Sequence, residues 1–520
     1  MKDLIRGIDD PEHLYASRSE AVFAVLVAMT AAGCSISDME SVFLNPLFPI
    51  AAHVLEQGDS AKYLKRNIEK ARLATIDRDV EKLNEKHALV LVGDKVAVLR
   101  EGLDEDGKGK IELLGTTAFK EWDGNQFVKR KGKKIPLAVH WLRHPQRRQY
   151  EGLVFVPNRE IPGYFNLWRG FAVKPHPGDC SRFLAHIRDN VCRGDEALYR
   201  WVVAWFAAIF QEPAKKYGTS LVIRGKMGTG KTVIGKHVGK LLGSAHYLPI
   251  SDPRYIIGRF NSHIVSCVLL HADEGFFAGD HAAEAKLKDL ITGDVQLIEF
   301  KNKDVVKVRN FVRLLVTGNA DWIAPAGLEE RRFAVIDIGE ARMQDKAYFA
   351  AIETEMENGG YEALLHFFLK YDMTGIDLRT IPKTAALFEQ KAASMTAEQG
   401  WWIDVLHSGK LPSGCETAGH CPTQSLFEAY ITHANQRGVR RRSIQTTLGI
   451  FLKKVAPGLR KREGTYRFGG DRQATGMIYE FPGLATCREH FEKMLQQEID
   501  WSGPNEWVVE SSSDDCFEPL

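Results

Sequence analysis

The clearest pattern of hydrophobic and polar residues lies between positions 218 and 340. Four apolar runs, SLVIRG, IVSCVLLHADE, FVRLLVTGN and RRFAVIDI, alternate there with segments of helical spacing. Strands that are apolar on both faces and separated by helices are typical of a parallel sheet covered on both sides. Such sheets bind ligands at the carboxyl ends of their strands, so the residues after each run are the first site candidates.

The regions before and after residues 218–340 have other spacings of hydrophobic residues. Residues 18–86 show helical spacing, with Ser19 and Asp77 as candidate N-caps, and short β-type runs follow to about residue 175. LYRWVVAWFAAIFQEP (198–213) predicts a buried helix that ends before Pro213. We therefore predict an α/β chain in five parts: a helical region (1–86), a mixed β-rich region (87–180), a central domain with a parallel sheet (181–375), a C-terminal region (376–500) and a disordered acidic tail (501–520).

The composition narrows the class of protein. A chain of 520 residues is too long for one core, and 44% hydrophobic and 26% charged residues are ordinary for globular domains. The eight cysteines lack regular spacing, and CETAGHC (415–421) has no second ligand pair at zinc-site spacing, which favours a loop in a reducing compartment. The longest apolar run, 21–33, is shorter than a membrane span. We expect a cytoplasmic protein without a membrane partner.

A glycine-rich segment follows the first apolar run. GKMGTGKT (225–232) fits the pattern G-x-x-x-x-G-K-[ST] and precedes a helical segment, VIGKHVGKLL. Glycines let successive N–H groups face phosphate oxygens, and the helix N-terminus favours an anion. The spacing predicts an ATP site in which the lysine binds the β- and γ-phosphates and the threonine hydroxyl binds Mg²⁺. The residues concerned are Gly225, Gly228, Thr229, Gly230, Lys231 and Thr232.

The second apolar run ends in an acidic pair, Asp273 and Glu274. Asp273 suits a direct or water-mediated ligand of Mg²⁺, and Glu274 can polarise an attacking water. An acidic pair after an apolar run is usually a solvated strand end. Its place 42 residues after Lys231, in the same sheet pattern, favours the catalytic interpretation.

The third apolar run ends in Asn319. On a strand beside the other two, an amide at the carboxyl end can hydrogen-bond the attacking water or the γ-phosphate without adding charge. Asn is also favoured as a cap of the turn GNAD. The two preceding motifs favour the catalytic interpretation.

Two adjacent arginines, Arg331 and Arg332, precede the fourth run. A guanidinium that stabilises the transition state at the γ-phosphate approaches from outside the loop, in cis or from a neighbouring subunit. Ordinary pairs with Glu329 and Glu330 are the alternative. We expect one of the two to be this catalytic arginine, the arginine finger, with Arg332 slightly favoured. The other is then structural.

Between Glu274 and Asn319, two alternating runs flank KNKD (301–304). This pattern predicts a β-hairpin with Lys301 and Lys303 at its tip. Lysines on a hairpin often serve only to protect an exposed edge. In a ring-shaped ATPase they could instead project into the pore and bind phosphates.

The order and spacing of these motifs resemble those of the superfamily 3 helicases, with the phosphate loop, the acidic pair, LKDLITGD and a hairpin, and the asparagine within 225–319. RWVVAWFAAIFQEP and LEERRFAVID are more narrowly similar to the primase-helicases of phages, plasmids and poxvirus-like viruses. The resemblance implies a hexameric AAA+-type ring that hydrolyses ATP and translocates on single-stranded DNA. It implies ATPase roles for Lys231, Thr232, Asp273, Glu274 and Asn319, a finger at Arg331 or Arg332, and DNA contacts at Lys301 and Lys303.

The resemblance extends toward the N-terminus. SRSEAVFAVLVAMTAAGCS and YLKRNIEKA look like the helical segment that follows the polymerising domain of primase-helicases. Because this segment begins near residue 17, we expect no primase domain in this chain. A separate primase or polymerase is then an expected partner.

The segment 437–467 is rich in Lys and Arg and has one acidic residue, Glu463. The sequence around this segment predicts helices followed by a β-hairpin, which is the order of a winged-helix domain. Such domains lie at the C-terminus of related initiator helicases. A solvated charged face is the alternative to DNA binding. The candidate phosphate contacts are Arg440, Arg441, Arg442, Lys453 and Lys454.

These features predict an ATP-dependent DNA helicase of a phage or mobile element, acting on single-stranded and forked DNA in a bacterial host cytoplasm. The alternative is an ATP-gated replication initiator or remodeller that binds DNA without processive unwinding. A small-molecule kinase uses the same loop but needs neither the hairpin nor the paired arginines.

Overall fold

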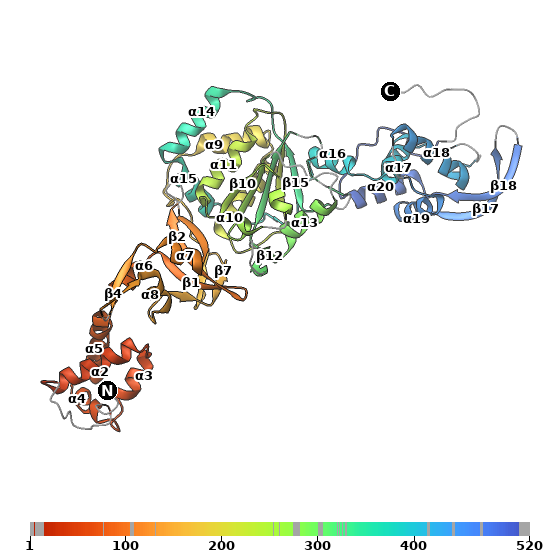
Figure 1. The fold of residues 1–520 in the computed structure, drawn as a ribbon. Helices are drawn as coiled ribbons and strands as arrows, with labels where there is room; N and C mark the ends of the chain where they lie inside the picture. Colours follow the sequence, from red (N-terminus) through yellow and green to blue (C-terminus); the bar gives the residue numbers. More distant parts are fainter. Residues whose placement is uncertain are drawn as a thin grey trace. The chain divides into compact units, whose positions relative to one another are not determined.

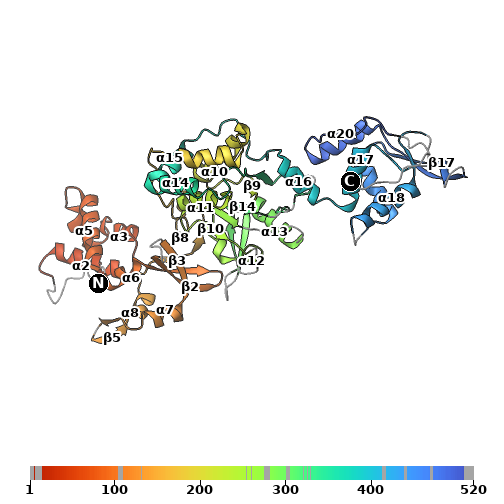
Figure 2. The same cartoon turned by 90° about the horizontal axis from the view of Figure 1, so that it is seen from above.

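In a computed structural model of the protein, the chain divides into two compact units, which we describe separately (Figures 1 and 2). Unit 1 comprises residues 1–169 and 297–308, and unit 2 comprises 170–296 and 309–520. The structure describes residues 5, 15–75, 77–103, 109–130, 132–252, 254–258, 261–273, 281–299, 305–319, 321, 323–324, 326–327, 330–412, 417–438, 442–468 and 472–508. None of the helices formed by these residues is long and apolar enough to cross a bilayer.

Unit 1 begins with a helical part whose elements are α2 (Arg18–Ala31), α3 (Ile36–Phe43), α4 (Ala52–Leu55), α5 (Ser60–Thr75) and α6 (Arg78–Asn84). The first four helices pack around one apolar core that includes Val25, Leu26 and Phe43. Asp77 caps α6, as its sequence position predicted, by accepting a hydrogen bond from the Asp79 N–H. The prediction of Ser19 as a cap was wrong. The extended backbone of Ser17 lets its hydroxyl accept from the N–H of the third residue along, so the helix begins earlier.

The second part of unit 1 is mixed. Its elements are β1 (His87–Val92), β2 (Lys95–Leu103), β3 (Gly109–Gly115), α7 (Thr116–Trp122), β4 (Phe127–Arg130), β5 (Lys133–Pro136), α8 (Leu137–Arg143), β6 (Gln149–Tyr150), β7 (Gly152–Val154) and β8 (Tyr164–Asn166). Four strands form a sheet of order β3-β2-β1-β6, and β4 and β5 form a separate hairpin. Phe119 and Trp141, both fully buried, join α7 and α8 to the core beneath this sheet.

Unit 2 contains a parallel sheet of five strands in the order β10-β11-β14-β9-β15. The strands are β9 (Ser220–Arg224), β10 (Tyr247–Ile250), β11 (Leu269–Asp273), β14 (Arg313–Gly318) and β15 (Phe333–Asp337). Every residue of β14 is buried, as the near-continuous apolar runs predict for a sheet covered on both faces. Figure 1 shows the sheet in green between helices that include α10 (Glu196–Gln211) and α11 (Lys231–Leu242).

Helix α10 is buried along almost its whole length, from Tyr199 to Phe210. Its C-terminal carbonyls are bound by Arg313, the first residue of β14, which is 5% exposed. This guanidinium donates to the carbonyl oxygens of Ala208, Glu212 and Pro213 at 3.4, 2.7 and 3.2 Å. Arg313 therefore adds charged donors to carbonyl groups at the end of α10 and in the turn after it, of which those of Ala208 and Glu212 also accept from backbone N–H groups.

The remaining helices of the central region are α9 (Ser181–Ala185), a π-helical turn (His186–Val191), α12 (Arg254–Ile257), α13 (His281–Thr292), α14 (Lys346–Glu355), α15 (Tyr361–Lys370) and α16 (Ala385–Ala393). After α13, the strands β12 (Val295–Glu299) and β13 (Val305–Arg309) pair as the predicted hairpin. Asn310 closes the end of α13, because its Nδ2 donates to the carbonyl oxygens of Leu290 and Gly293, both at 2.8 Å.

The C-terminal region has the elements α17 (Ala397–Ser408), β16 (His420–Pro422), α18 (Thr423–Gln436), α19 (Gln445–Val455), β17 (Arg460–Phe468), β18 (Arg472–Glu480) and α20 (Leu484–Leu495). Its three strands form a sheet of order β16-β18-β17 around one apolar core. Trp507 belongs to that core and is 8% exposed. The predicted disordered tail therefore does not begin at residue 501, because a buried tryptophan holds residues 501–508 to the fold.

Candidate functional site

The glycine-rich loop joins the end of β9 to the start of α11. Gly225, Gly228 and Gly230 have φ angles of 156°, 82° and 93°, which only glycine adopts without strain. A Cβ on Gly230 would lie 2.5 Å from Phe349 Cε1 and 2.8 Å from the His186 ring, so the loop is also packed tightly from behind. The loop is thereby held in a fixed curl at the carboxyl edge of the sheet.

A cavity of about 250 Å³ opens beside the loop. Its wall brings together residues predicted from three separate segments of the sequence: Gly228, Gly230, Lys231, Thr232, Asp273 and Asn319. The sheet order explains this meeting, because β14 lies between β11 and β9 and all three strands end at the same edge. Gly225 precedes this wall, and Thr229 is fully buried in the loop.

Lys231 is 7% exposed, and its Nζ donates to the carbonyl oxygens of Gly225 and Lys226, both at 2.6 Å. The Thr232 hydroxyl donates to Asp273, with both carboxylate oxygens at 3.1 Å. The site thus offers an ammonium group on one side. On the other side it offers a hydroxyl and a carboxylate, which are the oxygen ligands that Mg²⁺ prefers.

A chain of buried hydrogen bonds reaches Asp273 from inside the sheet, and the sequence analysis did not predict it. The Thr317 hydroxyl donates to Asp273 Oδ1 at 2.5 Å, so Thr317 must accept at 2.9 Å from Nε2–H of His271. Nδ1 of the neutral imidazole then accepts from the Tyr247 hydroxyl, also at 2.9 Å. Burial lowers the pKa of His271 to about 4, which fits this neutral form. The sequence signal was a histidine inside an apolar strand.

Two further residues support the loop from behind. His186, whose pKa burial lowers to about 4, lies with Nε2 3.4 Å from the Gly230 carbonyl oxygen and Nδ1 3.2 Å from the Tyr348 hydroxyl. Asn190 donates through Nδ2 to the Thr229 carbonyl oxygen at 2.9 Å, and its Oδ1 has no partner within the described part of the chain. Asn190 and Tyr348 also line a second cavity of about 450 Å³ behind the loop.

Arg331 and Arg332 lie at the opposite edge of the sheet from the cavity. The Arg332 carbonyl accepts from the N–H of Ser220, the first residue of β9, at 2.7 Å. The five residues of β15 then separate Arg332 from the carboxyl edge by roughly 16 Å. Buried Glu330 accepts from the N–H groups of Arg331 and Arg332 at 3.0 and 2.7 Å. Neither arginine is among the residues that line the cavity of its own chain.

Several predicted residues fall outside the described residues, namely Glu274, Lys301, Lys303, Arg440 and Arg441. Arg442, Lys453 and Lys454 are described and exposed. In CETAGHC, Cys415 is outside the described residues, and Cys421 is fully buried in β16. Its Sγ lies 3.5 Å from the Pro412 carbonyl oxygen, which fits a packed thiol.

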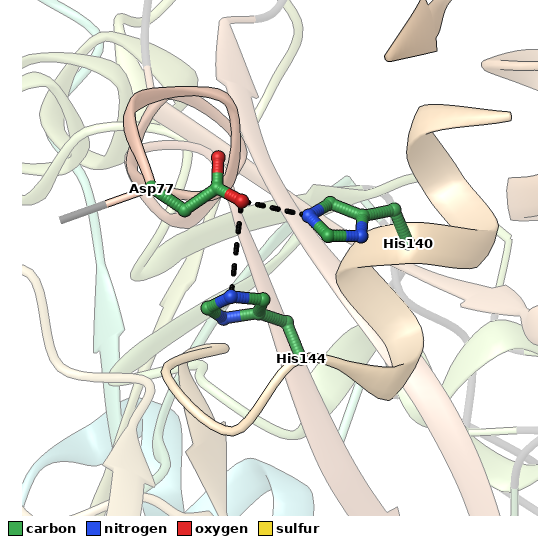
Figure 3. Close-up of side chains that lie close together, drawn as sticks. All are labelled: Asp77, His140 and His144. Carbon is green, nitrogen blue, oxygen red and sulfur yellow. Dashed lines mark hydrogen bonds and ion pairs between the residues drawn. The ribbon is translucent and has the colours of Figure 1, made fainter. Parts of the chain in front are cut away.

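One cluster in unit 1 has the composition of a metal site (Figure 3). Asp77, His140 and His144 place one ligand atom each within 4.8 Å of one another. Arg130 Nη2, however, donates to both oxygens of Asp77 at 2.7 and 2.8 Å. His144 Nδ1 accepts from the N–H of Gln146 at 3.2 Å, so the proton of the neutral ring is on Nε2, the atom that faces Asp77. A metal-bound histidine needs an acceptor on its other nitrogen, so these residues fit an ion-pair cluster rather than a metal site.

The segment that contains the glycine-rich loop and Asp273 is similar to known proteins. Residues 223–332, from the end of β9 to Arg332, match a family of unknown function (DUF5906). A stretch of 142 residues is 26% identical to the DNA primase-polymerase of Nitratiruptor phage NrS-1, and it spans 26% of this chain and 19% of that protein. The chain therefore matches about a fifth of the length of that relative.

The fold is also similar to solved structures. The apo structure of the NrS-1 C-terminal region superposes with a TM-score of 0.54 at 14% identity, covering 78% of this chain and 99% of the other. An A-form apo structure of the same region gives 0.53 at 15% identity, with 77% and 98% covered. At such identities the likeness concerns the fold.

Proposed function

We propose that this chain is an ATP-dependent DNA helicase of superfamily 3 that acts in the replication of a phage or other mobile element. The observation that carries the proposal is that one cavity at the carboxyl edge brings together Lys231, Thr232, Asp273 and Asn319, which follow three different strands. The partial similarity to a phage DNA primase-polymerase supports a role in phage DNA replication.

The proposed mechanism uses groups that line the cavity or the loop, together with Glu274, which lies outside the described residues. The loop N–H groups and the N-terminus of α11 bind the phosphates of ATP, and Lys231 exchanges two carbonyl partners for phosphate oxygens. Thr232 and Asp273 would hold Mg²⁺, which supplies neutralisation of charge between the β- and γ-phosphates. Asn319 orients the attacking water, and Glu274 accepts its proton. Thr317 keeps the Asp273 carboxylate turned toward the cavity.

The second cavity suits the base of the nucleotide. Asn190 holds the loop through Nδ2 and keeps Oδ1 as an acceptor, and the exocyclic amino group of adenine is a matching donor. This cavity shares no lining residue with the one beside Lys231, and Asn190 ties it to the loop through Thr229. Phosphates and base would therefore occupy two neighbouring cavities.

The proposal includes a ring, because the arginines are remote from the cavity of their own chain. Arg332, and less so Arg331, would act as a finger at the site of a neighbouring copy. The six-fold AAA+-type ring comes from the family resemblance. Lys301 and Lys303 would then contact single-stranded DNA in the pore.

One observation favours the second candidate, an ATP-gated initiator. The C-terminal order of α17, β16, α18, α19 and the hairpin β17–β18 is that of winged-helix domains, which bind duplex DNA. Arg440, Arg441, Arg442, Lys453 and Lys454 would supply its phosphate contacts. Tight duplex binding with weak strand separation would favour this function over the helicase.

The test is ATP hydrolysis by the purified protein with and without single-stranded DNA. We expect strong stimulation by DNA, complete loss in Lys231→Ala, and loss of stimulation in the double variant Lys301→Ala/Lys303→Ala. Mixing Arg332→Ala with Lys231→Ala should restore part of the activity, because each then supplies what its neighbour lacks. Hydrolysis that ignores DNA would contradict the helicase proposal.

A further inference from the structure

The mixed part of unit 1 has a face that the proposed function does not use. A cavity of about 950 Å³ is lined by residues of α6, α7, α8 and the strands β1, β2 and β3. Trp122 lies at this cavity and is 68% exposed, which is unusual for so large an aromatic side chain. The Arg100 guanidinium carbon lies 5.1 Å from the centre of its ring. The guanidinium thus lies over one face of this exposed aromatic ring.

Two polar residues at this cavity are buried without complete hydrogen bonding. His87 and Asp123 are each 6% exposed, and among the described residues neither His87 Nε2 nor Asp123 Oδ2 has a partner. His87 Nδ1 lies 3.3 Å from the Leu83 carbonyl oxygen and must donate to it. Nε2 is then an acceptor, so two acceptors buried behind the cavity wall lack a partner among the described residues.

The rim of the cavity continues into a strongly basic hairpin. Gln126 lines the cavity and directly precedes Phe127, the first residue of β4, which is 47% exposed. Lys134 on β5 places its Nζ 4.2 Å from the centre of the Phe127 ring. The segment 127–136 contains five Lys or Arg residues and no acidic residue. Aromatic rings among exposed cations are the two components from which surfaces for single strands are built.

Two of the acidic residues that line the cavity, Glu101 and Glu112, are held in ion pairs, while Glu85 and Asp123 also line it. Glu101 is paired with Arg148 and Arg169, each at 2.7 Å. Glu112 is paired with Arg100 and Lys110. The exposed lysines of the hairpin lie beyond these pairs and are available to phosphates.

We propose that this face of unit 1 binds single-stranded nucleic acid, with one base stacked on Trp122 and the phosphates along the β4–β5 hairpin. A base is accessible to such a ring only when it is unpaired, which favours a single strand over a duplex. The site requires no ATP. It goes beyond the proposed function, because it uses residues neither of the pore hairpin nor of the C-terminal helices.

The first test is binding of a fluorescently labelled single-stranded oligonucleotide to the full chain, measured by anisotropy without nucleotide. Trp122→Ala should weaken binding about tenfold, because one stacked base is lost. Trp122→Phe should bind nearly as well as the wild type, because a ring remains. DNA and RNA oligomers of one sequence show which sugar is preferred. Equal affinity of the wild type and Trp122→Ala would overturn the proposal.

The second test distinguishes phosphate binding along the β4–β5 hairpin from a general effect of charge. One variant changes three exposed hairpin lysines to Glu: Lys129, Lys133 and Lys134. Its matched control makes the same charge change on three exposed lysines of α5: Lys62, Lys65 and Lys70. The hairpin variant should lose most of its affinity and show a shallower dependence on salt, whereas the control stays within a few-fold of wild type. Equal losses, or an equal loss for duplex DNA, would refute the assignment.

The last control keeps the two proposals distinguishable. Lys231→Ala abolishes the proposed hydrolysis but should bind the oligonucleotide with unchanged affinity in the absence of nucleotide. Thermal unfolding of each variant confirms that it is folded, and Arg130 and Asp77 stay unchanged because they hold the hairpin to the unit. Loss of hydrolysis with intact binding, or the reverse, shows which proposal fails.

Discussion

Two carboxylates in this protein have similar neighbours and opposite surroundings. Asp77 in unit 1 and Asp273 in unit 2 both belong to hydrogen-bond networks that include histidine. A guanidinium, Arg130, already covers both oxygens of Asp77. The partners of Asp273 are hydroxyl groups, and this carboxylate lines a cavity.

The difference shows which carboxylate can bind a cation. A carboxylate that is neutralised by arginine has no charge left to offer, whereas one that holds hydroxyl groups keeps its charge and can bind a metal ion. Geometry alone selects the Asp77 cluster, because three possible ligand atoms lie within 4.8 Å of one another there. The hydrogen-bond partners of the two carboxylates instead favour Asp273 as the residue that binds a cation. Four experiments test this difference between Asp77 and Asp273.

The largest expected effect separates the two residues by activity. Asp273→Asn should reduce ATP hydrolysis by about a thousandfold or more, because the proposed Mg²⁺ ligand loses its charge. Asp77→Asn should leave the rate per folded molecule unchanged. Steady-state hydrolysis of both variants at saturating Mg²⁺ checks this, and comparable losses would erase the distinction.

The second experiment measures stability, for which we expect the substitution of Asp77 to have the larger effect. Asp77→Asn should lower the free energy of unfolding of unit 1 by about 2 kcal/mol, because Arg130 loses its carboxylate partner although the amide can still cap α6. Denaturant unfolding followed by tryptophan fluorescence measures it. Asp273→Asn, with its cavity position, should change stability by less than about 1 kcal/mol.

The third experiment uses pH. Burial alone would raise the pKa of Asp77, but hydrogen bonds from Arg130 and His140 outweigh it and hold the pKa at about 2. The stabilisation is therefore complete above the unfolded pKa near 4 and is lost as the pH falls toward 2. The loss is about 2 kcal/mol. Acid unfolding of Arg130→Met should show a smaller step, because only His140 then lowers the pKa of Asp77, and an unchanged profile would contradict the assignment.

The smallest expected effect concerns the support of Asp273. Thr317→Val removes the hydroxyl between His271 and the carboxylate while preserving shape. We expect the Mg²⁺ concentration for half-maximal hydrolysis to rise about tenfold, with the maximal rate less affected. Thr317→Ser keeps the hydroxyl and should behave like the wild type. A rate loss without a shift in Mg²⁺ dependence would favour a packing role.

The sequence was sufficient for the sheet and for much of the cavity. The apolar runs and the loop spacing predicted β9, β11, β14 and β15, and the strand order brings Lys231, Asp273 and Asn319 together. It was insufficient for the hydrogen-bond chain through His271, because pairing between distant strands decides which polar side chains meet. The spacing of hydrophobic residues also did not predict the burial of Trp507. That burial depends on a core assembled from elements about a hundred residues apart.

The sheet order has a consequence for synthesis of the chain. The strand β9 carries the phosphate loop, yet its two neighbours are β14 and β15, and β9 ends at Arg224 while β14 begins at Arg313. At about 5–20 residues per second, a ribosome takes roughly 5–20 s to make the intervening segment. Over that interval the carbonyls at the end of α10 also lack Arg313. A nascent chain released before β14 would carry the phosphate loop on an unpaired, apolar strand, and such fragments are targets for chaperones and proteases.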